Sequence, residues 1–450
     1  MARRGLAIID DALVRFQFSR RGGVLRSRRA GGRARAAAVT TVTTATAPSI
    51  TSALPRRLRT PLAIALALVL LGVLGYAILR GATYSNDFKN PYRVARVFWQ
   101  TGRLDIKSEP RYPPTARVLL APLASLPIAT AAAIWAVASV AALAAVPFMV
   151  RRLAGVAVGD QALGWLAVLT YAIDALVLGQ SDPINLLLVT VGLVIARERR
   201  PALGAVLVGL AGMIKVLPLA FWGVLIARRR IRGAVAGAAI TAALSVGLLT
   251  GFGGWSPGLH SISEWYTLLG ATEGPWGLVA ERNSMRENNE SLPVVLARTL
   301  GDLDPGLARN TPSLSRLPLR AIWAIWLAIA AAMALTWIAC ARRARYIPPD
   351  RAWLGIFGLT GVLMLTATHV AWPHYFLWLL PAALFVRHRP RLLVAVAAVG
   401  QLGMMFTVLR GIGVHMWLAL ALFAVVAHDL LRLPAEAPAE RALGPREGTG

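Results

Sequence analysis

Residues 197–232 read RERRPALGAVLVGLAGMIKVLPLAFWGVLIARRRIR, two apolar runs with one charge between them. The runs 201–212 and 216–227 hold about 12 residues each, whereas about 20 are needed to cross a bilayer. Arginine clusters at both ends hold those ends at one membrane surface. The pattern predicts a hairpin that turns near Lys215, as two short spans or a re-entrant loop. Irregular backbone at that depth is tolerated only beside protein or water, so we expect a cavity to reach Lys215.

Similar apolar blocks fill most of the chain. Hydrophobic residues make up 56% of its 450 positions and charged residues 15%, whereas soluble proteins carry about 25% charged residues. We therefore predict an all-α, polytopic transmembrane helical bundle over residues 61–431. Its twelve predicted membrane segments are 61–80, 128–150, 161–178, 183–197, 201–212, 216–227, 233–252, 319–341, 352–368, 373–386, 391–409 and 412–431.

The formal net charge of +27 comes largely from arginines at the ends of these apolar blocks. This distribution is typical of cytoplasmic loops and argues against nucleic acid as a partner. If Arg56, Arg57 and Arg59 are cytoplasmic, the later clusters fall on the same side. We then expect a multi-pass protein of the cell (plasma) membrane, with both termini cytoplasmic and the long loops 81–127 and 253–318 outside.

The two ends of the chain are predicted to be cytoplasmic extensions. Residues 1–60 hold 13 arginines against two aspartates, which indicates a basic disordered arm or a start codon placed too early. Residues 432–450 are the predicted tail. Cys340 is the only cysteine, so an intrachain disulfide is excluded and a Cys-based metal or redox site is not expected. His369 and His374, five residues apart with no acid nearby in the sequence, make a poor metal site, and no metal and no cofactor are predicted.

The first outer loop carries two features of interest. Residues 88–99 mix apolar and basic side chains, as in a short helix lying in the membrane interface. Just before them, Asp87 stands beside apolar neighbours outside the first span. Partial burial would raise its pKa toward the range of a general base, although a helix cap or a turn explains the residue equally well.

Lys215 is the sharpest anomaly, because intramembrane charges are costly and usually functional. A phosphate or an acidic partner would offset that cost, and snorkelling to the interface is the simpler alternative. Late in the chain, His369 and His374 flank a Trp-Pro pair. Histidine can donate to a phosphate or carry a proton, but the surrounding aromatic residues also suit a membrane-interface belt.

Other polar positions outside the membrane could contact a sugar. Tyr112 precedes two prolines that fix an extended backbone. Gln180 and Asn185 lie in a polar turn between two spans, and Asn289 lies in an Asn-Ser element before an apolar run. Loop stiffening, turn chemistry and solvation explain these residues without any ligand.

The order of these motifs resembles glycosyltransferase family 87, a GT-C-type membrane family that includes polyprenyl-phosphate-mannose-dependent mannosyltransferases. The resemblance covers roughly residues 61–431. It rests on the acid after the first span, Tyr112-Pro113-Pro114, the Gly179-Gln180 turn, Lys215 to Pro218, the Asn-Ser element and the late His-Trp-Pro-His stretch. The family turn is Gly-Gln-x-Asn, and the asparagine comes later here, which puts the role of Asn185 in doubt.

The resemblance implies a GT-C bundle and an inverting hexosyltransferase that needs no metal. The donor would be a polyprenyl-phosphate sugar, with mannose as the sugar that the resemblance implies, and its phosphate would lie against Lys215 and His374. Asp87 would deprotonate a hydroxyl of a lipid or glycan acceptor outside the cell. Tyr112, Gln180, Asn185, Asn289 and His369 would contact the substrates.

Two other functions fit parts of the pattern. A transporter or flippase for an anionic lipid or solute also uses broken helices and buried charges. It would need pseudo-symmetric halves, and no counterpart of the Lys215 hairpin is evident in the sequence of 319–431. A membrane scaffold without catalytic activity is the third alternative.

Overall fold

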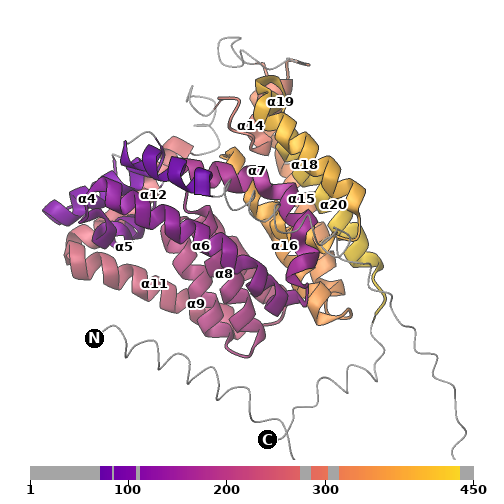
Figure 1. Cartoon of the computed structure of the whole chain (residues 1–450), viewed down its shortest axis with the longest axis horizontal. Coiled ribbons are helices and arrows are strands. Elements are labelled where there is room, and N and C mark those ends of the chain that lie inside the picture. The colour runs from indigo at the N-terminus through magenta and orange to yellow at the C-terminus, as the bar shows by residue number, and fades with distance from the viewer. Residues whose placement is uncertain (1–70, 84–85, 108–111, 274–284, 303–313, 436–450) are drawn as a thin grey trace, which may run out of the picture. The chain divides into compact units, whose positions relative to one another are not determined.

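The computed structural model describes residues 71–83, 86–107, 112–273, 285–302 and 314–435. The predicted arm 1–60 and most of the predicted tail lie outside these residues. A helical stretch spans Leu71–Ala82. The later elements are α4 Lys89–Thr101, α5 Pro114–Ala124, α6 Ile128–Ala154, η1 Val158–Gln161, α7 Ala162–Leu178, α8 Asp182–Arg197, α9 Pro201–Ile214, η2 Leu217–Phe221, α10 Trp222–Ala227, α11 Ile231–Gly253, α12 Trp255–Glu273, α14 Leu292–Leu300, α15 Leu319–Arg343, α16 Pro349–Ala367, η3 Pro373–Leu379, α17 Leu380–Phe385, α18 Pro390–Met405, α19 Thr407–Gly411 and α20 Val414–Arg432, where η marks a 3₁₀ helix (Figure 1).

The all-α prediction is confirmed for the part of the chain that the structure describes, where one isolated bridge joins Gly301 and Leu317. Helix ends follow the local sequence. Proline stands at the first position of α9, α16 and α18, where its missing N–H costs no hydrogen bond. Gly179 ends α7 with φ of +66°, a left-handed conformation that glycine adopts without strain.

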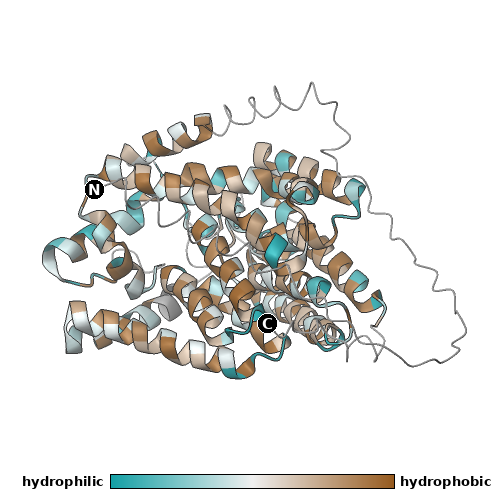
Figure 2. Cartoon of the chain, turned by 60° about the horizontal axis from the view of Figure 1, so that its bottom comes forward, coloured by the Kyte–Doolittle hydropathy of each residue, from teal (hydrophilic) through white to brown (hydrophobic). Residues whose placement is uncertain are grey.

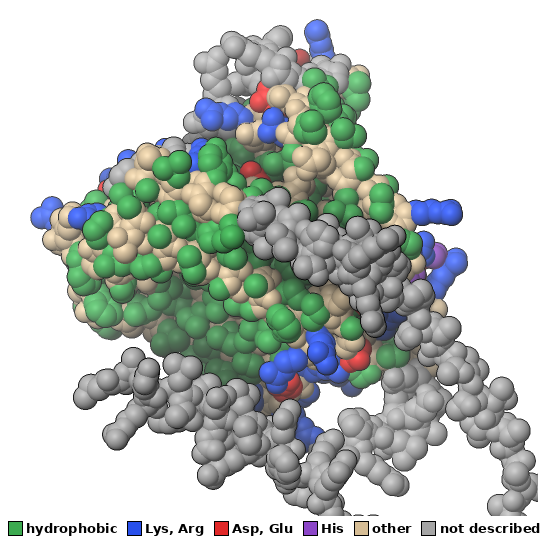
Figure 3. All heavy atoms as spheres, viewed as in Figure 1, with side chains coloured by type: hydrophobic (Ala, Val, Ile, Leu, Met, Phe, Trp, Pro, Cys, Tyr) green, Lys and Arg blue, Asp and Glu red, His purple; other side chains and the backbone are tan. Residues whose placement is uncertain are grey.

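Five described helices are long and apolar enough to cross a membrane: α6, η1 with α7, α11, α15 and α20. Only 17% of the apolar window of α11, and the same share of α15, is buried within the protein. These helices therefore present apolar surface to lipid. Figure 2 shows hydrophobic residues on many of the helices, and Figure 3 shows hydrophobic side chains over much of one face with Lys and Arg in groups. The total of twelve spans stays a prediction.

The helices pack in two neighbourhoods. α6, α8, α9 and α11 contact one another in succession, while α7, α16, α17, α18 and α20 contact one another elsewhere (Figure 1). Close packing in the first set uses small residues, as is common in membranes. A Cβ at Gly192 would lie 2.6 Å from the carbonyl oxygen of Gly204. The loop helix α4, predicted at 88–99, packs on α5.

Two helical hairpins are broken in the same way. α9 ends at an extended Lys215, and the chain resumes in η2 and α10. α16 ends before the irregular stretch 368–372, and the chain resumes in η3 and α17. The expectation that 319–431 holds no counterpart of the Lys215 hairpin is therefore wrong. The predicted segments 352–368 and 373–386 already leave a gap at this break. Its likeness to the first hairpin was not evident because the first arm, α16, is as long as a full span and no lone lysine marks the break.

Candidate active site

A polar cavity of about 500 Å³ lies among segments far apart in the sequence. Its lining comes from α4 and the turn before it, the stretch before α5, α7 and the turn after it, both hairpin breaks, the stretch before α14, and the α18–α19 region. The lining residues are Asp87, Asn90, Tyr112, Asp174, Leu178, Gln180, Lys215, Arg286, Asn288, Trp372, Pro373, His374, Tyr375, Met404 and Arg410. Five of the predicted site residues are thus brought together: Asp87, Tyr112, Gln180, Lys215 and His374.

Asp87 is half-buried and held by the turn after α7. Its backbone N–H donates to the carbonyl of Leu178 at 3.0 Å, and its Oδ2 accepts from Gln180 Nε2 at 2.8 Å. The turn can approach this closely because Gly179 has no side chain: a Cβ there would lie 2.8 Å from Cβ of Phe88. Asp87 is thus fixed at the cavity wall by elements that the sequence separates by about 90 residues.

Lys215 has an acidic partner. Its Nζ lies 2.8 Å from Oδ2 of Asp182, and the ring centroid of Tyr375 lies 3.7 Å from Nζ. Trp378 Nε1 donates to the other oxygen of Asp182 at 3.0 Å. The Asp182 side chain is 1% exposed and that of Lys215 is 12% exposed. Of the two ways to offset the cost of a buried ammonium, the structure shows the acidic partner.

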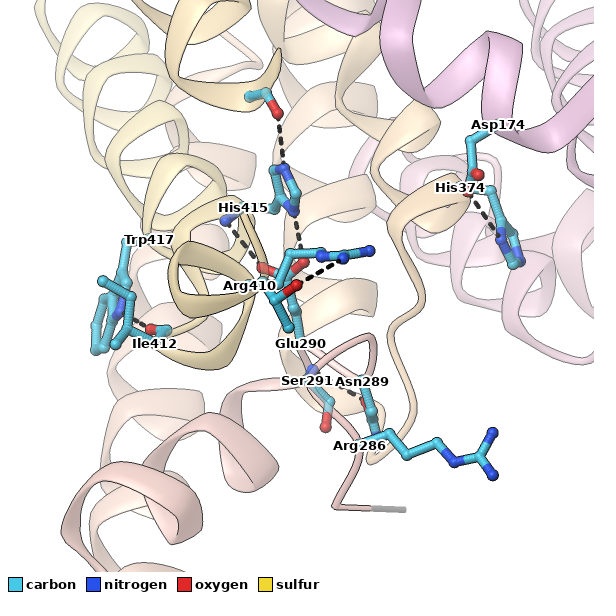
Figure 4. A network of polar contacts seen from close by, with 12 residues as sticks. Asp174, Arg286, Asn289, Glu290, Ser291, His374, Arg410, Ile412, His415 and Trp417 are labelled. Carbon is cyan, nitrogen blue, oxygen red and sulfur yellow. Dashed lines mark hydrogen bonds and ion pairs between the residues drawn. The ribbon is translucent and has the colours of Figure 1, made fainter. Parts of the chain in front are cut away.

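His374 lies between two carboxylates without a hydrogen bond to either. Its Nδ1 is 3.6 Å from Oδ2 of Asp174, and its Nε2 is 3.9 Å from Oδ2 of Asp182. Both ring nitrogens are buried and lack a hydrogen-bond partner among the described residues. Buried polar groups are usually satisfied, so the imidazole is suited to receive a water or a substrate group from the cavity. Figure 4 shows His374 beside Asp174.

Asn289 and His369 are joined away from the cavity lining. Asn289 Nδ2 donates to the carbonyl of His369 at 3.1 Å, and its Oδ1 accepts from the N–H of Ala371 at 3.0 Å. Ser291 Oγ donates to the same carbonyl at 2.7 Å. The backbone N–H of Ser291 donates to Oδ1 of Asn289 at 3.2 Å, and Figure 4 shows these two residues side by side. These contacts fix the second hairpin break. Asn185 is also fully buried, and its Nδ2 donates to Ser181 Oγ at 3.2 Å.

A second buried acid–base pair lies behind this loop. His415 Nδ1 is 2.5 Å from Oε1 of Glu290, and its Nε2 is 2.9 Å from the carbonyl of Gly400 (Figure 4). Both side chains are fully buried. Nearby, burial lowers the pKa of Arg298 to about 10, while the carboxylates of Glu290 and Glu287 act in the opposite direction. Arg298 therefore keeps its charge at neutral pH.

Several residues of the cavity are not among the predicted site residues. Asp174 stands inside the predicted span 161–178, so the rule that singled out Lys215 as an intramembrane charge applies to it equally. Asp182 is not among the predicted site residues, although a buried lysine requires an acid nearby. Arg286 and Arg410 carried no local signal, because their position on the cavity depends on long-range packing.

The sequence profile of glycosyltransferase family 87 matches residues 111–368. The chain belongs to glycosyltransferase family 87. It is therefore a membrane glycosyltransferase, and the resemblance in its motifs is confirmed at the level of the family. No curated protein and no solved structure matches the chain. Within this family 87 chain, Tyr112, Gln180 and Lys215 fall inside the matched region, whereas Asp87 and His374 fall outside it.

Proposed function

We propose that this family 87 enzyme transfers a sugar, mannose, from a polyprenyl-phosphate donor to a hydroxyl of an extracytoplasmic lipid or glycan acceptor, with inversion. The observation that carries the proposal is the composition of one cavity. It holds an oriented carboxylate, Asp87, together with cationic and imidazole groups suited to a phosphate. An inverting displacement needs a base on one side of the sugar and a stabilised leaving group on the other.

The proposed step is a single displacement at the anomeric carbon. The acceptor oxygen forms the new bond as the bond from the anomeric carbon to the phosphate oxygen breaks. The electron pair stays with the polyprenyl phosphate, and the acceptor proton passes to Asp87. Gln180 supports this role because its hydrogen bond at 2.8 Å to Oδ2 leaves Oδ1 of Asp87 for the acceptor. Phosphate is already a good leaving group, so the step is proposed to need no metal.

The other predicted contacts divide into two groups by their surroundings. Tyr112, Lys215 and His374 line the cavity and are proposed to contact the substrates directly. Asn185, Asn289 and His369 lie outside that lining, and their contacts favour support of the cavity wall. Because Lys215 is paired with Asp182, it is better suited to donate a hydrogen bond than to supply net positive charge.

The decisive experiment compares donors. Purified protein in lipid should transfer sugar from polyprenyl-phosphate mannose, and EDTA should leave the rate unchanged. Protein incubated with GDP-mannose alone should form no product. Transfer from GDP-mannose, with none from the lipid donor, would refute the proposal.

One structural feature favours a second candidate. Two broken hairpins in corresponding arrangement are found in transporters, and this chain has them. The same vesicles distinguish the two activities. Movement of the intact lipid across the bilayer, with no glycosidic product, would favour the transporter.

The orientation of the site is proposed from the arginine clusters. A reporter that is active only outside the cytoplasm should be active when fused at residue 105 and silent at residue 229. The reverse result would place the cavity on the cytoplasmic side, where it could not use a lipid donor presented at the outer face.

A further inference from the structure

The part of the cavity around Lys215 carries no surplus of positive charge. Asp182 lies 2.8 Å from the ammonium, and Asp174 lies 3.6 Å from His374. Even with His374 protonated, two carboxylates balance the two cations. An anionic phosphate gains little Coulomb energy at a site whose own charges cancel. The groups near Lys215 therefore leave the leaving group without net electrostatic stabilisation.

Two other cations of the same cavity are not cancelled in this way. Arg286 is exposed, and Arg410 is half-buried. Arg410 Nη2 makes a long contact of 3.4 Å to Thr407 Oγ1, and its Nε is buried without a hydrogen-bond partner. No described carboxylate lies within ion-pair distance of either guanidinium. In Figure 4 both side chains extend away from the Glu290–His415 pair, on the side where His374 lies.

A third arginine, Arg298, hydrogen-bonds to the backbone at both Arg286 and Arg410. Arg298 on α14 is 1% exposed. Its Nη1 donates to the carbonyl of Arg286 at 2.5 Å, and its Nη2 donates to the carbonyl of Arg410 at 3.4 Å. Arg286 and Arg410 are 124 residues apart in the sequence, yet one buried guanidinium spans them. This arrangement sets the two cavity arginines before any ligand arrives, which lowers the cost of binding an anion.

We propose that Arg286 and Arg410 form the binding site for the phosphate of the lipid donor, with Arg298 as their positioning residue. The inference rests on the proposed function and places the phosphate away from Lys215. Guanidinium groups bind phosphate oxygens in a bidentate, charge-assisted manner. Lys215 and His374 then face the sugar or the acceptor rather than carrying the phosphate.

The reaction itself explains why two uncancelled cations are needed. The donor is a phosphodiester with one negative charge, and the released polyprenyl phosphate is a monoester that approaches two. The second charge develops as the bond to the anomeric carbon breaks. Fixed cations that face the developing charge stabilise the transition state more than the ground state. The arginine pair should therefore bind the polyprenyl phosphate product more tightly than the diester donor.

The experiment uses full-length protein in lipid and measures donor KM, kcat, acceptor KM and product inhibition by polyprenyl phosphate. Arg286→Gln and Arg410→Gln should each raise the product inhibition constant on the order of 10-fold or more, as for loss of a charge-assisted hydrogen bond. kcat should fall and acceptor KM should stay within about 2-fold. Arg103→Gln removes an exposed arginine outside the cavity lining and is the matched control. Arg298→Gln should show the same pattern as the two cavity variants.

Several outcomes overturn the inference. Unchanged product inhibition in Arg286→Gln and Arg410→Gln, with wild-type transfer intact, rejects the phosphate site but leaves the proposed function standing. A rise confined to acceptor KM assigns the arginines to an anionic acceptor instead. Wild type that makes no product from the lipid donor rejects the proposed function itself. If a glutamine variant unfolds, Arg286→Lys and Arg410→Lys replace it, because they retain the charge and should show a smaller rise of the same constant.

Discussion

The two broken hairpins share a plan and differ in how their polar groups are satisfied. In the α9–η2–α10 hairpin, Lys215 is held by Asp182 at 2.8 Å and covered by the ring of Tyr375. In the α16–η3–α17 hairpin, His374 has no hydrogen bond at either nitrogen among the described residues. The first break has a closed charge pair, whereas the second presents an unsatisfied group to the same cavity.

The difference teaches that a charge at membrane depth does not by itself identify the reactive group. In the closed pair each charge offsets part of the desolvation cost of the other, so removing one partner alone leaves an uncompensated buried charge. The open imidazole contributes little to stability and is available for a ligand. The backbone of the second break, by contrast, is held by side chains. Asn289 and Ser291, in the stretch before α14, hydrogen-bond to the backbone of residues 369–371.

The largest stability effect is expected at the closed pair. Lys215→Met leaves Asp182 buried without a cation, and removal of one partner of a buried pair costs about 3–5 kcal/mol. The double variant Lys215→Met, Asp182→Asn should recover most of that loss. The midpoint of thermal unfolding in detergent measures both, with exposed Lys107→Met as the control. If the unfolding midpoint fell equally in the single and the double variant, Lys215 and Asp182 would not stabilise each other as an ion pair.

A smaller effect is expected where the second break is anchored. Asn289→Ala removes the bonds to the carbonyl of His369 and the N–H of Ala371, and unsatisfied buried groups cost about 1–3 kcal/mol. Transfer activity should fall as well, because residues 372–375 line the cavity. The neighbouring Asn288→Ala should leave the unfolding midpoint near wild type. A wild-type midpoint for Asn289→Ala would contradict the anchoring.

The smallest stability effect is expected at the open group. His374→Gln removes no hydrogen bond of the resting protein, so the free energy of unfolding should change by less than about 1 kcal/mol. The transfer rate should nevertheless fall on the order of 10²-fold, as for loss of a preorganised donor. If His374→Gln were strongly destabilised but its folded fraction transferred sugar at the normal rate, His374 would be a structural residue and not a ligand-binding one.

Much of the fold was predictable from the sequence, because apolar run length and arginine position act locally. The predicted segments 128–150 and 319–341 are both helices. The chain also breaks at Lys215, the position that its lone charge indicated. The predicted segments 352–368 and 373–386 also leave a gap where the second break lies. Its likeness to the Lys215 hairpin was not predicted, since the contacts from Asn289 and Ser291 that fix it are long-range.

The candidate site was predictable only in part for the same reason. Asp87 and Gln180 are brought together in one cavity by a turn whose glycine could be read from the sequence. Asp174 could have been found by the rule used for Lys215. Arg286 and Arg410 could not, because a buried guanidinium on α14 brings their backbones together.

Asp87 is the proposed general base of a sugar transfer carried out in this cavity. The decisive measurement is the turnover of Asp87→Asn with polyprenyl-phosphate mannose, beside Asp174→Asn and the control Asp105→Asn, which lies outside the cavity lining. Asparagine keeps the size of the side chain but does not take the acceptor proton. With Asp87 as the base, kcat of Asp87→Asn should fall on the order of 10²-fold or more, and Asp105→Asn should stay near wild type. Near-normal turnover by folded Asp87→Asn, with the loss found in Asp174→Asn instead, would contradict it and make Asp174 the base.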